Sequence, residues 1–141
     1  MIPYYKSPMT ILFVDDDRDF HLALSLSLPA DKGPYLFIHD PVEALRCLRQ
    51  MKINNISVVF MDYLMPKMTG LEVFEQAGSL CAEKILLTAT RDDKIIAEAL
   101  NRGLIHRHIS KQDPNVIQKI IEALQTGTQN YFKRLADKSQ G

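Results

Sequence analysis

The sequence has 141 residues, about the length of one domain, which is enough for a single hydrophobic core covered on more than one face. Seventeen basic residues balance 17 acidic ones, and this neutrality excludes a nucleic-acid surface made by this domain alone, because phosphate binding needs an excess of Lys and Arg. No apolar run reaches the roughly 18 residues that cross a bilayer, and no signal peptide opens the chain, so we expect a cytoplasmic protein with two buried, reduced thiols, Cys47 and Cys81.

The first half of the chain predicts short apolar strands that alternate with helices. In chain order these are a strand over 10–15, a helix over 17–28, a strand over 34–38, a helix over about 41–51 and a strand over 57–62. Asp40 is expected to cap the second helix, with Pro41 at its first helical position. The third strand, "SVVFMD", is almost entirely apolar and ends in the carboxylate of Asp62.

The second half continues the same alternation. It predicts a helix over 69–78, a strand over 84–88, a helix over 91–103, a weaker strand over 104–110 and a last helix opened by Asp113-Pro114. Thr69 and Glu72 have the spacing of a capping box, and Gly103 is expected to end the fourth helix. Such alternation favours an open, doubly wound, five-stranded parallel sheet with helices on both faces.

We divide the chain into an N-terminal arm over 1–8, a main domain over 9–125 and a C-terminal segment over 126–141. The last helix is expected to run on to about residue 138, because apolar residues continue its spacing despite Gly127. Tyr131, Phe132 and Leu135 are then expected to be exposed. A homodimer stem, a connection to a further output domain and a frayed tail all remain open for this segment.

Polar residues stand where the predicted strands end. Asp15 and Asp16 end the first strand, Asp62 the third and Thr88 the fourth, and the fifth runs out to Lys111. Ligands of open parallel sheets bind beyond the carboxyl ends of the strands, so these five side chains are expected to meet at one rim. Crowded carboxylates repel one another, and a divalent cation such as Mg²⁺ removes that conflict.

The chemistry of this rim suits phosphoryl transfer. Thr88 and Lys111 can donate hydrogen bonds to phosphoryl oxygens, while Asp62 can act as the nucleophile that takes up the phosphoryl group. Each residue alone also has an ordinary interpretation, since acids before a helix often cap it and a lone lysine is usually solvated. The joint placement at the ends of four strands favours a functional site.

Four motifs resemble the receiver domain of two-component response regulators, a family with a CheY-like fold: "ILFVDDD", "MDYLMPKMTGLEV", "LLTAT" and "ISKQDP". The resemblance covers roughly residues 9–125 and implies the strand order 2-1-3-4-5. It implies that Asp15 and Asp16 bind Mg²⁺ together with Asp62, which a histidine kinase or phosphotransfer protein would phosphorylate. It also implies that Thr88 is the signalling hydroxyl and Lys111 the site lysine.

The chain departs from the family pattern at several positions. Gln112 follows Lys111 where the family usually has Pro, and His108 stands where the family often carries a Tyr or Phe switch. Leu64 and Thr90 occupy positions where the family tunes dephosphorylation. Leu64 offers only its backbone carbonyl to the metal and cannot orient an attacking water, so we expect a long-lived phosphoryl group.

The leading interpretation is therefore a phosphorylated signalling module rather than a metabolic enzyme. Its output surface is expected on the helix over 91–103 and the fifth strand, facing a downstream protein or a linked output domain. The alternative is a Mg²⁺-dependent phosphatase or phosphotransferase with an aspartyl nucleophile. That chemistry needs an acid two residues after the nucleophile, where this chain has Leu64.

Overall fold

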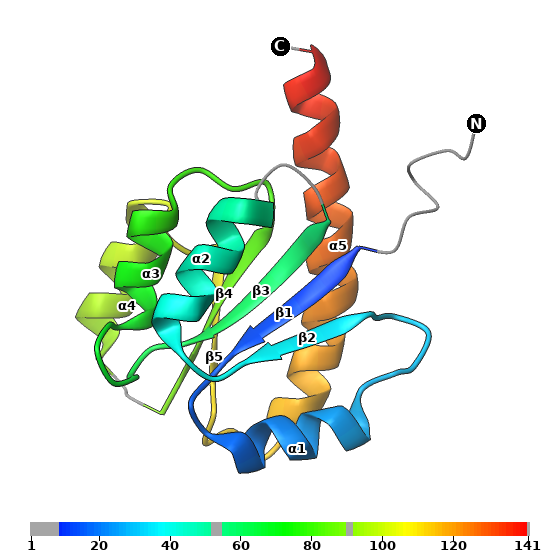
Figure 1. Cartoon of the computed structure of the whole chain (residues 1–141). Helices are drawn as coiled ribbons and strands as arrows, with labels where there is room; N and C mark the ends of the chain where they lie inside the picture. The colour runs from blue at the N-terminus through cyan, green and yellow to red at the C-terminus, as the bar shows by residue number, and fades with distance from the viewer. Residues whose placement is uncertain (1–8, 52–54, 90–91, 141) are drawn as a thin grey trace.

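The computed structural model describes residues 9–51, 55–89 and 92–140, and the predicted N-terminal arm lies outside these ranges. In this part of the chain, five parallel strands alternate with five helices (Figure 1). The strands are β1 Thr10–Val14, β2 Tyr35–Ile38, β3 Ile56–Asp62, β4 Glu83–Thr88 and β5 Arg107–Ser110. The helices are α1 Arg18–Ser27, α2 Pro41–Met51, α3 Gly70–Ala77, α4 Asp93–Asn101 and α5 Val116–Gln140. None of the helices in the described ranges is long and apolar enough to cross a membrane.

The sheet has the order β2-β1-β3-β4-β5, which confirms the predicted doubly wound architecture. Every neighbouring pair is parallel, with Val14 opposite Met61 and Thr88 opposite Ser110. The carboxyl ends of the strands therefore share one edge, as the site prediction requires.

Two hydrophobic cores lie on the two faces of the sheet. One joins the sheet to α2, α3 and α4, and the other joins it to α1 and α5 (Figure 1). All seven residues of β3 are buried, because helices cover both of its faces, and this explains its nearly continuous apolar sequence. On the second face, the ring of Phe13 stacks on those of Phe60 and Phe37, with centroids 4.7 and 5.3 Å apart.

Side-chain caps fix where several helices begin. The predicted capping box is present, because Thr69 accepts from the Glu72 N–H and Glu72 accepts from the Thr69 N–H. The Asp40 carboxylate accepts from the N–H of Glu43, as expected for the cap of α2. The last helix begins at Val116 and not at the predicted Pro114, because residues 110–115 form a turn around Asp113.

The C-terminal segment is helical and is packed against the domain. α5 continues through Gly127 to Gln140, so the boundary that we placed at 125 lies inside one continuous helix. A Cβ at Gly127 would lie 3.0 Å from Val58 Cγ2, so glycine allows the helix to approach the sheet closely. Tyr131 is only 5% exposed and hydrogen-bonds to the backbone of Asn55, so its predicted exposure is wrong, whereas Phe132 is exposed as expected.

A buried carboxylate anchors the same segment. Glu83, the first residue of β4, accepts from Asn130 Nδ2 at 2.9 Å and from Arg134 Nη2 at 2.6 Å. Arg134 also donates to the carbonyl of Cys81 at 3.3 Å. Hydrogen bonds to both carboxylate oxygens compensate for the burial of this charge, which would otherwise be costly. These contacts hold the described part of this segment as a helix against the sheet, and its role stays a prediction.

Candidate functional site

Three of the predicted residues form an acidic cluster at the carboxyl edge of the sheet. Asp15, Asp16 and Asp62 each offer an oxygen atom, and these atoms lie within 4.8 Å of one another. Asp15 and Asp62 are buried, whereas Asp16 is exposed. The third acid of the triplet has another role, because Asp17 is the N-cap of α1 and accepts from the Phe20 N–H. The acidic run thus divides into cluster residues and a helix cap.

The surroundings of Asp62 disfavour its charged form. Burial and, next, the negative charge of Asp15 raise the pKa of its carboxyl from 3.8 to about 7, against the opposing effect of Lys111. Asp16 adds a smaller effect in the same direction. A carboxylate held in this way is stabilised by any cation that enters the cluster.

Lys111 supplies positive charge to the cluster. Its Nζ donates to Asp15 Oδ2 at 2.6 Å and lies 3.7 Å from Asp62 Oδ1, so its closest resting partner is Asp15. Burial lowers the pKa of Lys111, but the hydrogen bond to Asp15 and the charges of Asp62 and Asp15 raise it more, so the net shift is upward. The ammonium therefore stays protonated between the two buried carboxylates.

The segment after β3 keeps the chain close to Asp62. The Gly70 N–H donates to the carbonyl of Tyr63 at 2.8 Å, which closes the loop. A Cβ at Gly70 would collide with the Asp62 carbonyl oxygen and lie 2.6 Å from Met61 Cγ, so only glycine fits here. Lys67, within this loop, pairs with Asp40 at 3.1 Å and ties the loop to the start of α2.

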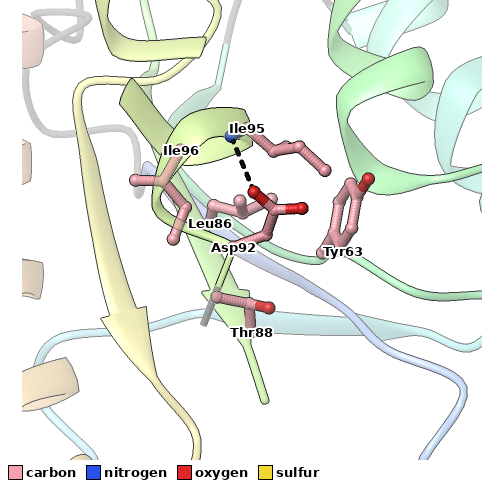
Figure 2. Close-up of a pocket in the computed structure, with 6 residues that line it drawn as sticks. All are labelled: Tyr63, Leu86, Thr88, Asp92, Ile95 and Ile96. Carbon is pink, nitrogen blue, oxygen red and sulfur yellow. Dashed lines mark hydrogen bonds between the residues drawn. The ribbon is translucent and has the colours of Figure 1, made fainter. Parts of the chain in front are cut away.

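Thr88 lies at the end of β4, next to the strand that carries Asp62. It is 3% exposed, and its carbonyl accepts from the Lys111 N–H at 3.0 Å. Figure 2 shows the small pocket between Thr88 and α4, which is lined by Tyr63, Leu86, Thr88, Asp92, Ile95 and Ile96. In this pocket Asp92 accepts from the Ile95 N–H and so caps α4 beside Thr88 (Figure 2).

A larger groove also borders Thr88. It has a volume of about 440 Å³ and is lined by Thr88, Asp93, Ile96, His108, Ser110, Gln112, Asp113 and Pro114. His106 and His108 are both exposed, and the Nδ1 of His106 accepts from the Lys84 N–H at 2.9 Å. Because residues of both α4 and β5 line the groove, it lies on the predicted output surface.

The predicted apolar residues of α4 are divided between core and surface. Ile96 and Ala99 are buried, Ile95 is half-buried, and Leu100 is 39% exposed. Leu100 is the penultimate residue of α4. The predicted modulating residue Thr90 lies outside the described residues.

The donor set suits a hard divalent cation. Three carboxylates on one rim, with a lysine and a hydroxyl nearby, match the few carboxylate ligands that Mg²⁺ takes while it keeps waters and phosphate oxygens. Leu64 is 61% exposed next to this rim, and the role of its backbone carbonyl as a metal ligand stays a prediction.

Sequence reasoning missed two contacts of the site. The ring centroid of Phe20 lies 4.8 Å from Lys111 Nζ. His21 is 4% exposed, and neither ring nitrogen has a hydrogen-bond partner; burial, His39 and Lys111 lower its pKa to about 4. The apolar periodicity of α1 could have indicated that both residues face inward, but not what they contact.

Comparisons with known proteins identify a family for this arrangement. The family model "Response regulator receiver domain" matches residues 11–131, which is most of the chain. The response regulator MprA of Mycobacterium sp. (strain KMS) is 34% identical over 88 residues, which cover 62% of this chain and 37% of that protein. The phosphatase alternative finds no support in these similarities.

Solved structures agree with the family match. The Legionella pneumophila response regulator LqsR has a TM-score of 0.85 and 37% identity, over 93% of this chain and 47% of that one. A CheY-like receiver domain protein from Methanospirillum hungatei JF-1 has a TM-score of 0.71 and 24% identity over 87% of this chain and 98% of that one, which supports the fold. The chain thus spans less than half the length of MprA and LqsR.

Proposed function

Because this chain belongs to the response regulator receiver domain family, we propose that Asp62 is its phosphoacceptor. The observation that carries this proposal is the convergence of Asp15, Asp16 and Asp62 with Lys111 at one edge of the sheet. If each of these side chains only stabilised its own segment, there would be no reason for the buried carboxylates of Asp15 and Asp62 to share Lys111. A site that takes up a phosphoryl group with a divalent cation does explain it.

The reaction follows from the positions of the side chains. A carboxylate oxygen of Asp62 attacks the phosphorus of a phosphohistidine, the new P–O bond forms, the P–N bond breaks, and the imidazole leaves with the bonding electrons. Lys111 lies within 4 Å of the nucleophilic carboxylate and can donate to the transferred oxygens. Thr88, at the end of the neighbouring strand, would supply a hydroxyl donor once the phosphoryl group is in place.

Asp15 and Asp16 would hold Mg²⁺ together with Asp62. When bound, Mg²⁺ neutralises charge on the carboxylates and on the phosphoryl oxygens. Asp15 is the member of this set that also holds Lys111, so it orients the ammonium while it contributes a ligand.

A histidine kinase or phosphotransfer protein is the proposed donor, and α1 carries the surface that suits its docking. Leu22 and Leu26 are 60% and 81% exposed on this helix, which begins directly after the acidic triplet. Exposed large apolar residues beside a reaction centre mark an interaction surface. Transfer from a kinase requires ATP in the same compartment, so the proposal includes a cytoplasmic location.

The proposed output face is the groove between α4 and β5, where Thr88 and His108 line the same space. Phosphorylation adds nearly two negative charges at the rim, and a shift of Thr88 toward them would alter this groove and the pocket behind it. His108 would respond where the family often has an aromatic switch. A downstream protein, a linked output domain or a second copy of the chain could read the change.

The proposal is tested by incubating the protein with Mg²⁺ and acetyl phosphate and measuring its intact mass. We expect the parent to gain one phosphate and Asp62→Asn to gain none, with Asp19→Asn, an exposed acid on α1, as the matched control that behaves as the parent. Chelation of Mg²⁺ should abolish the gain. Equal labelling of the parent and Asp62→Asn would contradict the assignment.

A further inference from the structure

We propose that Phe20 is a positioning residue for Lys111, holding the ammonium between Asp15 and Asp62 for phosphoryl transfer. This inference rests on the proposed function of Asp62. The ring centroid of Phe20 is 4.8 Å from Lys111 Nζ, which is within the range of a cation–π contact. Only 16% of the Lys111 side chain is exposed, so the contact is largely shielded from water.

Phe20 is part of a ring of contacts that connects Asp15, Asp17 and Lys111. The Asp17 N–H donates to Asp15 Oδ1 at 2.9 Å, and the Phe20 N–H donates to Asp17 Oδ1 at 3.1 Å. The Phe20 ring covers the ammonium of Lys111, which donates back to Asp15 Oδ2 at 2.6 Å. The helix cap thus fixes Phe20 relative to the same carboxylate that holds Lys111.

An aromatic ring is chemically suited to this task. An ammonium has three N–H donors, and in the resting protein Asp15 accepts one of them, with Asp62 3.7 Å away. The ring attracts the charge through its electron-rich face without offering a lone pair, so it limits movement of the ammonium and leaves donors for the phosphoryl oxygens. A polar residue in its place would compete for those donors.

Phe20 also packs against the second core cluster, so ordinary packing must be separated from positioning. Leu28 provides the comparison, because it is partly buried on the same cluster at the other end of α1. Phe20→Leu removes the ring and keeps an apolar side chain, whereas Phe20→Tyr keeps the ring. Leu28→Ala weakens packing of α1 without touching Lys111.

The first test uses NMR of the unphosphorylated protein. The ring current of Phe20 should shift the side-chain methylene protons of Lys111, and we expect Phe20→Leu to return them toward the values of a free lysine. Phe20→Tyr and Leu28→Ala should preserve the shift. Unchanged Lys111 resonances in Phe20→Leu would overturn the proposal, and this readout does not depend on phosphorylation.

The second test measures the rate of labelling by acetyl phosphate at saturating Mg²⁺. We expect Phe20→Leu to be slower by about fivefold, the factor typical of one partly desolvated cation–π contact, while Phe20→Tyr and Leu28→Ala stay near the parent rate. Equal slowing in Phe20→Leu and Leu28→Ala would reduce Phe20 to a packing residue. A parent that gains no phosphate would contradict the function of Asp62, and the NMR result would still decide the ring contact.

Discussion

Replacement of the proposed phosphoacceptor by asparagine should stabilise the metal-free protein at alkaline pH. The folded structure raises the pKa of Asp62 to about 7 from 3.8, because it buries the carboxyl beside Asp15. Below pH 3.8 the carboxyl is protonated in both states, and folding does not change its charge. As the pH rises from 3.8 to about 7, the unfolded chain releases the proton of Asp62 before the folded protein does. The free energy of unfolding therefore falls over this pH range.

The magnitude follows from the difference between a pKa of 3.8 in the unfolded chain and a pKa of about 7 in the folded protein. Each unit corresponds to about 1.4 kcal/mol, so ionised Asp62 costs about 4 kcal/mol of folding free energy at pH 8. Asp62→Asn removes the charge and keeps nearly the same shape. We therefore expect the variant to be more stable than the parent by up to about 4 kcal/mol at pH 8, and by less than about 1 kcal/mol at pH 4.

Urea unfolding followed by far-UV circular dichroism measures this difference, with a chelator present to keep the site metal-free. Added Mg²⁺ should stabilise the parent at pH 8 and leave Asp62→Asn much less affected, because a ligand that binds only the folded state adds to its stability. Asp19→Asn controls for loss of an acid from the same end of the sheet. If Asp62→Asn is no more stable than the parent at pH 8, the conclusion that ionised Asp62 destabilises the metal-free fold is refuted.

Three further predictions concern the rest of the domain. The folded structure lowers the pKa of His21 from 6.5 to about 4, so neutral His21 stabilises the fold above pH 6.5 and this stabilisation is lost as the pH falls to 4. His21→Phe should remove up to about 3 kcal/mol of the change in unfolding free energy over this pH range, measured by urea unfolding. Leu64→Asn should lose its acyl phosphate faster than the parent in a mass-spectrometric time course, and equal or slower decay would contradict our expectation for Leu64. Arg134→Met leaves Glu83 buried without its cation and should cost about 3 kcal/mol in urea unfolding, whereas exposed Lys133→Met should be near neutral.

The sequence was sufficient to predict the fold and the rim. Five apolar runs alternating with amphipathic segments allow few arrangements other than a parallel sheet, and parallel strands bring their carboxyl ends to one edge. The positions of Asp15 and Asp62 were therefore predictable, because Asp62 ends a buried strand and Asp15 directly follows another. The capping box of Thr69 was predictable for a similar reason, since it depends only on local spacing.

Contacts between side chains from distant segments could not be predicted in the same way. The preference of Lys111 for Asp15, and its contact with Phe20, depend on how α1 packs against the end of β5. The burial of Tyr131 depends on Gly127, which allows α5 to approach β3 and β4. Periodicity shows that a residue faces inward, but tertiary packing decides which groups it meets.

The most direct test of the account is to locate the phosphoryl group within the chain. Borohydride reduces an acyl phosphate to an alcohol, so a protein labelled with acetyl phosphate and Mg²⁺ and then reduced should yield a peptide with homoserine at position 62. We predict this product in the parent and its absence when Mg²⁺ is chelated. Labelling confined to another residue, with Asp62 recovered unchanged, would contradict the assignment of Asp62 and the mechanism built on it.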